Sequence, residues 1–144
     1  MLIGEYIHRI DPKKRLAIPA KFRKDLGDKA VITKGLDQFL VLYPLSEWEK
    51  VAESLAKLPT GKSESRNFVR DFFSGAADVE IDALGRILIP EYLKNFADLK
   101  EKVVIVGVYN RLEIWNEQKW DDYKARVEKQ TDMLAEKLGE LGVY

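Results

Sequence analysis

Two aspartate–arginine pairs carry most of the chemistry that this sequence could perform. Asp11 is followed four positions later by Arg15, and Asp82 by Arg86, each inside an Ile-Asp-x-x-x-Arg segment that continues into an apolar run and a proline. A carboxylate can hold a guanidinium in place, and an oriented guanidinium can bind a phosphate or a guanine edge through two parallel hydrogen bonds. The pairs therefore indicate turns that close on themselves, contacts prepared for an outside ligand, or both.

Positive charge gathers around the first pair. Residues 8–24 hold seven basic residues and one acid, a local balance of +6, although the whole chain has 24 basic and 24 acidic residues. Lys13 and Lys14 lie within that stretch, directly before Arg15. A charged turn is usually a solvated turn, but Arg is the best single reader of guanine and Lys can neutralise phosphate. We therefore expect one basic face rather than a basic protein.

These observations assign candidate roles. The candidate DNA-contacting residues are Arg15, Lys13, Lys14 and Arg86, with Arg86 either adding a contact or bracing the site, and the bracing carboxylates are Asp11 and Asp82.

Catalytic and metal sites find little support. Asp11 and Asp82 could form a proton-sharing dyad, but an adjacent arginine would keep each carboxylate ionised. The chain has no cysteine and only one histidine, His8, so neither a thiol nucleophile nor a histidine-rich zinc site can form. We therefore expect that the protein is not an enzyme and binds no cofactor or metal. We interpret His8 as an ordinary histidine on a strand.

The elements that position the arginines come from an internal duplication. Residues 10–23 return as residues 81–93 at an offset of 71, and after one inserted residue the register continues at an offset of 72. Each unit reads as strand, turn, strand, short helix, strand and strand, followed by a longer helix. Duplicated units of this kind suit a small closed β-barrel, because pairing the halves removes free sheet edges.

The helices outside these strands are apolar on one side. The sequence predicts a capping box at Ser46 and Glu49 that opens a helix, a short aromatic helix over residues 63–73, and one long C-terminal helix capped by Asn116. The aromatic helix and the C-terminal seam could pack on their own unit or on another subunit. The longest apolar runs are far shorter than the ~20 residues of a membrane helix, so we expect a soluble, cytoplasmic protein.

The two motifs, with Phe72-Phe73-Ser-Gly-Ala before the second and Glu113-Ile-Trp near the end, resemble the MraZ family of bacterial DNA-binding regulators. The resemblance runs from Gly4 to about Trp120. It implies an α+β fold, an internally duplicated AbrB-like swapped-hairpin small β-barrel with flanking helices. The first repeat would span residues 1–62. The second would span residues 63–144, with a preceding short helix and a long C-terminal helix, and the two would co-fold as one compact unit.

The resemblance also implies a function. The expected partners are double-stranded promoter DNA and the chain itself, as a ring-shaped homo-oligomer that binds repeated short boxes upstream of its own division and cell-wall operon, usually as a repressor. Such a protein would be nucleoid-associated. The family usually has glycine before the first arginine, whereas this chain has Lys14, which leaves open whether the first turn adopts a positive φ. The alternative is a protein-interaction or antitoxin-like module that binds DNA weakly.

Overall fold

A computed structural model describes residues 1–143 as a mixed α/β fold in which both repeats contribute to one body. The first repeat supplies β1 (Leu2–Arg9), β2 (Arg15–Ala17), α1 (Ala20–Leu26), β3 (Lys29–Lys34), β4 (Leu40–Pro44) and α2 (Leu45–Ala56). Residues 63–140 supply α3 (Ser63–Ser74), β5 (Ala77–Glu80), β6 (Arg86–Leu88), α4 (Glu91–Phe96), β7 (Lys102–Tyr109), β8 (Leu112–Asn116), α5 (Glu117–Glu128) and α6 (Thr131–Glu140).

The strands of the two repeats interleave. They form a six-stranded sheet in the order β1-β7-β8-β4-β3-β5 and a two-stranded sheet of β2 and β6, with every pairing antiparallel. The first strand of each repeat therefore pairs with the third strand of the other, β1 with β7 and β5 with β3. The order reads the same from either end once equivalent strands are exchanged, so the body has an approximate two-fold axis between β4 and β8.

The core is built from equivalent positions of both repeats. Leu16 and Ile87 are 0% and 1% exposed, and Ile18 and Ile89 are both fully buried. Side chains alternate across a strand, so burying Leu16 and Ile87 turns their neighbours outward. Burial of one face of the small β2–β6 sheet therefore fixes which of its residues reach solvent.

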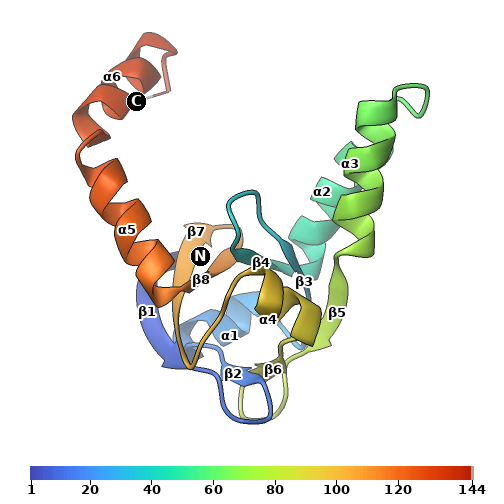
Figure 1. Ribbon diagram of the computed structural model, residues 1–144, viewed down its shortest axis with the longest axis vertical. Coiled ribbons are helices and arrows are strands. Elements are labelled where there is room, and N and C mark those ends of the chain that lie inside the picture. Colours follow the sequence, from blue (N-terminus) through green and yellow to red (C-terminus); the bar gives the residue numbers. More distant parts are fainter. Residues whose placement is uncertain (144) are drawn as a thin grey trace.

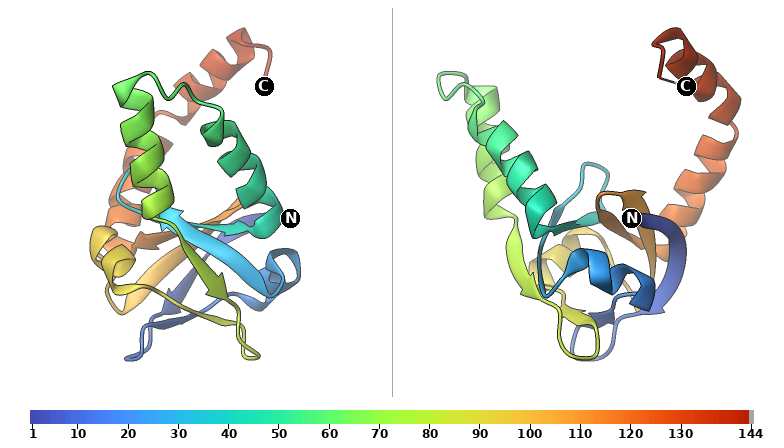
Figure 2. Two further views of the ribbon diagram at one scale, coloured as in Figure 1. Left: turned by 90° about the vertical axis from the view of Figure 1, so that its right-hand side faces the viewer. Right: turned by 180° about the vertical axis from the view of Figure 1, so that it is seen from behind.

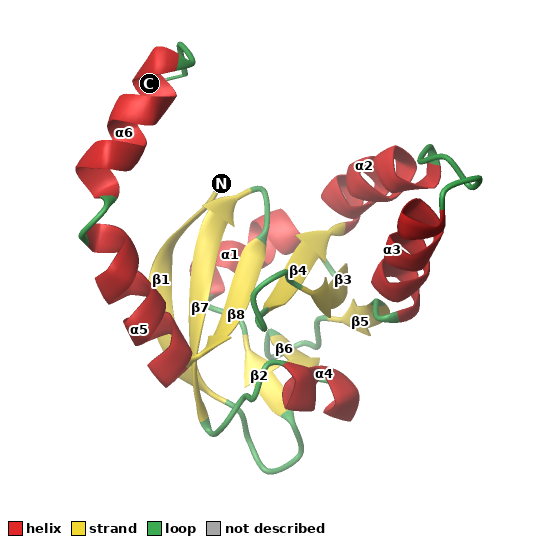
Figure 3. Cartoon of the chain, turned by 45° about the horizontal axis from the view of Figure 1, so that its top comes forward, coloured by secondary structure: helices red, strands yellow, loops and turns green. Residues whose placement is uncertain are grey.

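The helices divide the molecule into two ends. The α2–α3 hairpin and the α5–α6 segment project as two arms from one side of the body, and the turns that lead into β2 and β6 lie at the opposite end (Figures 1 and 2). Figure 3 shows the same arms standing clear of the strands. No helix within residues 1–143 is long and apolar enough to cross a membrane.

The predicted long C-terminal helix is wrong as a single element, because it breaks at residues 129–130 between α5 and α6. The Thr131 hydroxyl donates to the carbonyl of Val127 at 3.2 Å, and the Gln130 N–H donates to the same oxygen at 2.9 Å. A threonine side chain that bonds the carbonyl four residues back competes with the helical backbone and bends it.

The predicted capping box is also wrong. α2 begins at Leu45 with Pro44 in the cap position, so Ser46 already lies inside the helix and no side chain caps it. The repeat register explains the shift, because Pro44 is the equivalent of Asn116 at the offset of 72. Asn116 caps α5 as predicted, accepting a hydrogen bond from the Lys119 N–H at 2.9 Å.

Candidate nucleic-acid interface

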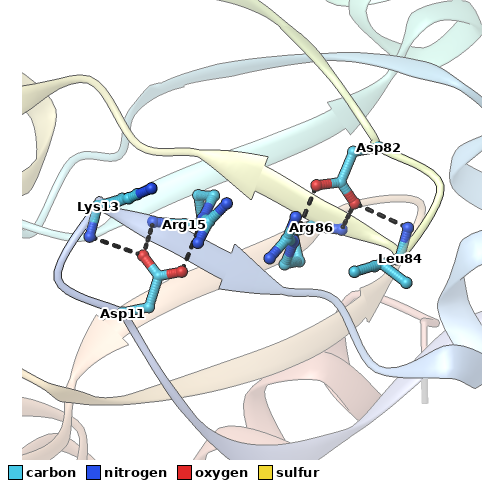
Figure 4. Close-up of polar contacts among 6 residues, drawn as sticks. All are labelled: Asp11, Lys13, Arg15, Asp82, Leu84 and Arg86. Atoms are coloured by element: carbon cyan, nitrogen blue, oxygen red, sulfur yellow. Dashed lines mark hydrogen bonds and ion pairs between the residues drawn. The ribbon is translucent and has the colours of Figure 1, made fainter.

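The two arginine motifs meet on one small ribbon. β2 and β6 pair so that Arg15 faces Leu88 and Ala17 faces Arg86. Arg15 and Arg86 are therefore diagonal neighbours on the outer face, while Leu16 and Ile87 point into the core. In Figure 4 the two arginines lie in the middle of the ribbon, between the two aspartates.

Asp11 organises the first turn with both carboxylate oxygens. Its Oδ1 accepts from the backbone N–H groups of Lys13, at 2.9 Å, and Arg15, at 2.8 Å. Its Oδ2 accepts from Arg15 Nε at 2.7 Å. One side chain therefore fixes both the path of the turn and the direction of the guanidinium.

Asp82 repeats this arrangement in the second turn. Its Oδ1 accepts from the Leu84 and Arg86 N–H groups, each at 2.9 Å, and its Oδ2 accepts from Arg86 Nε at 2.8 Å (Figure 4). In each motif the aspartate engages the arginine through Nε alone. Within residues 1–143, the terminal Nη atoms of Arg15 and Arg86 have no hydrogen-bonding partner, which leaves the two-pronged end of each guanidinium available.

Each turn also holds the other repeat. The Ile18 N–H donates to the carbonyl of Gly85 at 2.8 Å, and the Ile89 N–H donates to the carbonyl of Lys14 at 2.9 Å. Both carbonyls belong to residues in the left-handed region, with φ of 63° at Lys14 and 76° at Gly85. The first turn thus keeps a positive φ although a lysine occupies the position.

The environment of both aspartates favours their charged form. Hydrogen bonds from the backbone N–H of Arg15, and then from the Arg15 side chain and the Lys13 N–H, lower the pKa of Asp11 below its ordinary value of 3.8. The pKa of Asp82 is lowered in the same way, first by the Arg86 N–H. A proton-sharing dyad would need one raised pKa. The two carboxylates instead lie at opposite ends of the ribbon, each held by its own arginine.

The lysines of the first turn differ in their surroundings. Lys13 is exposed at the tip. Lys14 forms an ion pair with Glu91 at the start of α4, and this contact also lowers the pKa of Glu91. Part of the positive charge predicted for the first turn is therefore neutralised within the molecule, because Lys14 pairs with Glu91 and Arg15 with Asp11, whereas Lys13 has no ion pair among the described residues.

The motifs alone did not predict the contribution of Arg23. Its Nε donates to the Ile18 carbonyl at 3.0 Å, and its guanidinium covers Gly85 so closely that a Cβ there would lie 2.0 Å from Nε. The contact joins the end of α1 to the turn of the other repeat. No local pattern could have indicated it, because the two residues meet only when the repeats interleave.

His8 has a structural contact and, among the described residues, is not part of a metal-binding cluster. His8 Nδ1 lies 2.7 Å from the carbonyl of Ala17, so the histidine ties β1 to β2. Within residues 1–143, no three His, Cys, Asp or Glu side chains come together as a metal site.

A second surface lies between the helical arms. It is a groove of about 970 Å³ lined by residues of the β3–β4 loop, α2, α3 and α5. On the α2–α3 arm, Trp48 stacks on Phe72 with ring centroids 5.4 Å apart, and Phe68 follows at 6.1 Å from Phe72. Phe68 remains 43% exposed, so the aromatic helix predicted from the sequence packs on α2 with one side and faces solvent with another.

Comparisons with known proteins point in one direction. The family model described as "MraZ protein, putative antitoxin-like" matches the chain twice, at residues 1–71 and 72–138. The transcriptional regulator MraZ of Desulforamulus reducens is 47% identical over 141 residues, covering 98% of this chain and 99% of the relative. The proteins of the same name from Clostridium beijerinckii and Pelotomaculum thermopropionicum are each 48% identical, over 99% of this chain and 100% and 99% of their own lengths.

Proposed function

Because this chain belongs to the MraZ family, it is a transcriptional regulator, and we propose that it acts by sequence-specific binding to double-stranded promoter DNA. The observation that carries the proposal is the ribbon on which Arg15 and Arg86 lie side by side, each oriented through Nε by an aspartate. A β-ribbon fits the DNA major groove, and an oriented arginine can bind guanine O6 and N7 with two hydrogen bonds. Transcriptional regulators of this kind need no catalytic site.

The exposure and charge of the residues in the two turns also favour DNA binding at this face of the ribbon. The side chains of Arg15 and Arg86 are 34% and 29% exposed, so they are accessible but held. Lys13 at the tip would contact phosphate, and Lys14 would do so if DNA displaced Glu91. Asp11 and Asp82 would act as positioning residues that stay with their arginines and do not touch DNA.

The proposal extends to the DNA sequences that the protein binds and to the effect of binding on transcription. As the resemblance implies, we propose that the protein binds repeated short boxes in the promoter of its own division and cell-wall operon, and that it represses by covering that promoter. It would then be found in the cytoplasm with the nucleoid. One ribbon offers few contacts, so affinity would come from several subunits that engage neighbouring boxes at high effective concentration.

We also propose that the fold is an AbrB-like swapped-hairpin barrel, with a first repeat at residues 1–62 and a second at residues 63–144. The pairing of β1 with β7 and of β5 with β3 supports this, because each repeat sends its first strand into the other. The shared core supports co-folding as one unit.

Assembly into a ring would use the arms. α6 and Leu141, which directly follows it, expose an apolar seam in which Met133 is 60%, Leu134 and Leu138 are 43%, and Leu141 is 75% exposed. The groove between the arms is also apolar where Phe68 and Phe72 of α3 line it. A head-to-tail contact between two different surfaces can close into a ring, so we propose that α6 of one subunit packs against the groove of the next.

Sedimentation tests the ring directly. We expect a mass several times 16.6 kDa at micromolar concentration, and Leu138→Glu should shift the protein toward that single-chain mass. A wild-type protein found only at 16.6 kDa would exclude the assembly. A forced monomer that bound the promoter as tightly as the wild type would exclude the avidity mechanism.

Titration against DNA tests the central proposal. The protein is added to a fluorescent duplex from upstream of its own gene and to a scrambled duplex at about 0.15 M salt, where weak non-specific attraction is screened. We expect a preference of about a hundredfold or more for the native duplex. Arg15→Lys should lose most of it, because lysine keeps the charge but not the two-pronged contact.

The matched control is Arg126→Lys, on α5 and away from both turns, which should retain the preference. Equal binding to both duplexes by the folded wild type would contradict the proposal. The alternative of an antitoxin-like module would then gain support, and the aromatic groove would be the place to look for its protein partner.

A further inference from the structure

The two turns have the same backbone conformation, but they expose different side chains. At the offset of 71, Lys13 corresponds to Leu84 and Ala17 corresponds to Leu88. Leu84 is 64% and Leu88 59% exposed, whereas the Leu16 and Ile87 side chains on the opposite face of the ribbon are buried. The first turn therefore presents charge, and the second presents two large apolar side chains.

These leucines flank the second arginine. Leu84, Arg86 and Leu88 alternate along the second turn and β6, and Leu88 lies directly opposite Arg15 in the ribbon. Residues two apart on a strand are separated by about 6.6 Å, and successive bases on one DNA strand by about 3.4 Å. If Arg86 reads one base pair, Leu88 on the same strand reaches base edges about two steps away, and Leu84 extends from the turn on the other side of Arg86.

One group in the major groove matches an apolar side chain. The C5-methyl of thymine projects there, and contact with alkyl side chains distinguishes thymine from the other bases. Phosphates and the other base edges are polar, so they offer no comparable partner for leucine. A single exposed leucine needs no explanation. Two exposed leucines that flank a guanidinium on the proposed DNA-binding face do need one.

We propose that Leu84 and Leu88 are specificity-determining residues that contact thymine methyl groups next to the guanine read by Arg86. This inference rests on the DNA-binding function proposed above. It makes the two ends of the ribbon chemically unequal, because the first turn carries Lys13 at the position where the second turn carries Leu84. A bound box would therefore be read in one direction only, although the backbone of the ribbon is nearly two-fold symmetric.

Replacing thymine with deoxyuridine tests the inference, because it removes the methyl group and leaves every hydrogen-bonding group unchanged. The wild type should bind the native upstream duplex about fourfold more tightly per contacted methyl than the deoxyuridine duplex. The folded double variant Leu84→Ala/Leu88→Ala should bind the two duplexes equally. Ile7→Ala, which is 63% exposed on β1 outside both turns, should keep the wild-type ratio.

The outcomes separate this inference from the function beneath it. A wild type that prefers the native over the scrambled duplex but binds thymine and deoxyuridine duplexes equally would overturn the leucine proposal and leave DNA recognition intact. A double variant that keeps the thymine preference would overturn it too. Loss of all preference in the wild type would contradict the DNA-binding function itself.

Discussion

Asp11 and Asp82 each link backbone geometry to the direction of a guanidinium. Because the charged form accepts three hydrogen bonds in each turn, folding favours ionisation and lowers the pKa of both groups. In the unfolded chain the same groups titrate near their ordinary value of 3.8. A lowered pKa contributes stability that is present above this value and is lost as pH falls through the native pKa.

We therefore expect stability to depend on these aspartates only above the acid range. Asp11→Asn/Asp82→Asn should lower the free energy of unfolding at pH 6, and the gap to the wild type should narrow as pH falls below about 3.8. Urea denaturation at a series of pH values measures this. Asp37→Asn, at an exposed hairpin position, is the control and should cost little at any pH. A gap that stayed constant down to the lowest pH would refute the charge-based account.

Lys14 and Gly85 have the same backbone conformation but different neighbours. A non-glycine residue in the left-handed region costs roughly 1–2 kcal/mol, and Lys14 bears this cost while it pairs with Glu91. At Gly85 a side chain would also displace Arg23, whose Nε would lie 2.0 Å from the new Cβ.

Gly85→Ala should therefore destabilise the protein by two separable effects. The backbone contributes about 1–2 kcal/mol, and displacing Arg23 from the Ile18 carbonyl adds about 1 kcal/mol. In an Arg23→Ala background only the first effect should remain, so a double-mutant cycle measured by urea unfolding should give a coupling near 1 kcal/mol. Strict additivity of the two substitutions would show that the guanidinium moves away without cost.

At the level of elements, equivalent helices begin in different ways. α5 starts at a true side-chain cap: Asn116 is 8% exposed, accepts from the Lys119 N–H and donates from Nδ2 to the Asp98 carbonyl at 2.7 Å. α2 starts after Pro44 without any side-chain cap. The two arms that frame the groove therefore depend on different contacts for their position.

Asn116→Ala should lower the free energy of unfolding by about 1–3 kcal/mol, because it removes a cap and leaves the part-buried Asp98 carbonyl without its donor. Ser46→Ala, the residue that the sequence pattern marks as a cap, should change it by less than about 0.5 kcal/mol. Urea denaturation of both variants measures the difference. A larger effect at Ser46 would mean that α2 is capped by its side chain after all.

The sequence predicted the elements better than their ends. The strands and short helices follow from alternation, turn residues and the repeat register, and these signals are local. The break before Thr131 was missed because it depends on one hydrogen bond that competes with the helical pattern. The shifted start of α2 was missed because Pro44, and not Ser46, occupies the cap position. At the candidate site, Asp11, Arg15, Asp82 and Arg86 were recognised by their spacing. The contact of Arg23 with Gly85 was not, since it arises only from the crossing of the repeats.

At the scale of the whole molecule, the surfaces that we propose for DNA binding and for assembly lie at opposite ends. β2 and β6 lie at one end of the body and the helical arms, whose residues line the groove, lie at the other (Figure 1). A chain built in this way can join its neighbours through α3 and α6 without covering β2 and β6. Every ribbon of an assembly would then stay open to DNA, which is the geometry that avidity needs.

Interleaving also determines how much of the chain can fold alone. In a fragment of residues 1–71, β1 would lack its partner β7, β2 would lack β6, and β3 would lack β5. The fragment therefore keeps only the β3–β4 hairpin pairing, and a two-stranded hairpin is marginal by itself. However, β3 is the repeat equivalent of β7, so a second copy of the fragment could supply the missing partner for β1.

We expect residues 1–71 to have no folded monomeric state. Circular dichroism should show little structure at low concentration and a gain of structure as concentration rises and dimers form, while an equal amount of residues 72–144 should restore a one-to-one complex. Sedimentation of the same samples distinguishes monomer, dimer and complex. If the fragment unfolded cooperatively as a monomer, with a midpoint independent of concentration, the two repeats would be independent units and the co-folding proposal would be wrong. Strand exchange between repeats predicts the opposite, because each repeat supplies the edge that the other lacks.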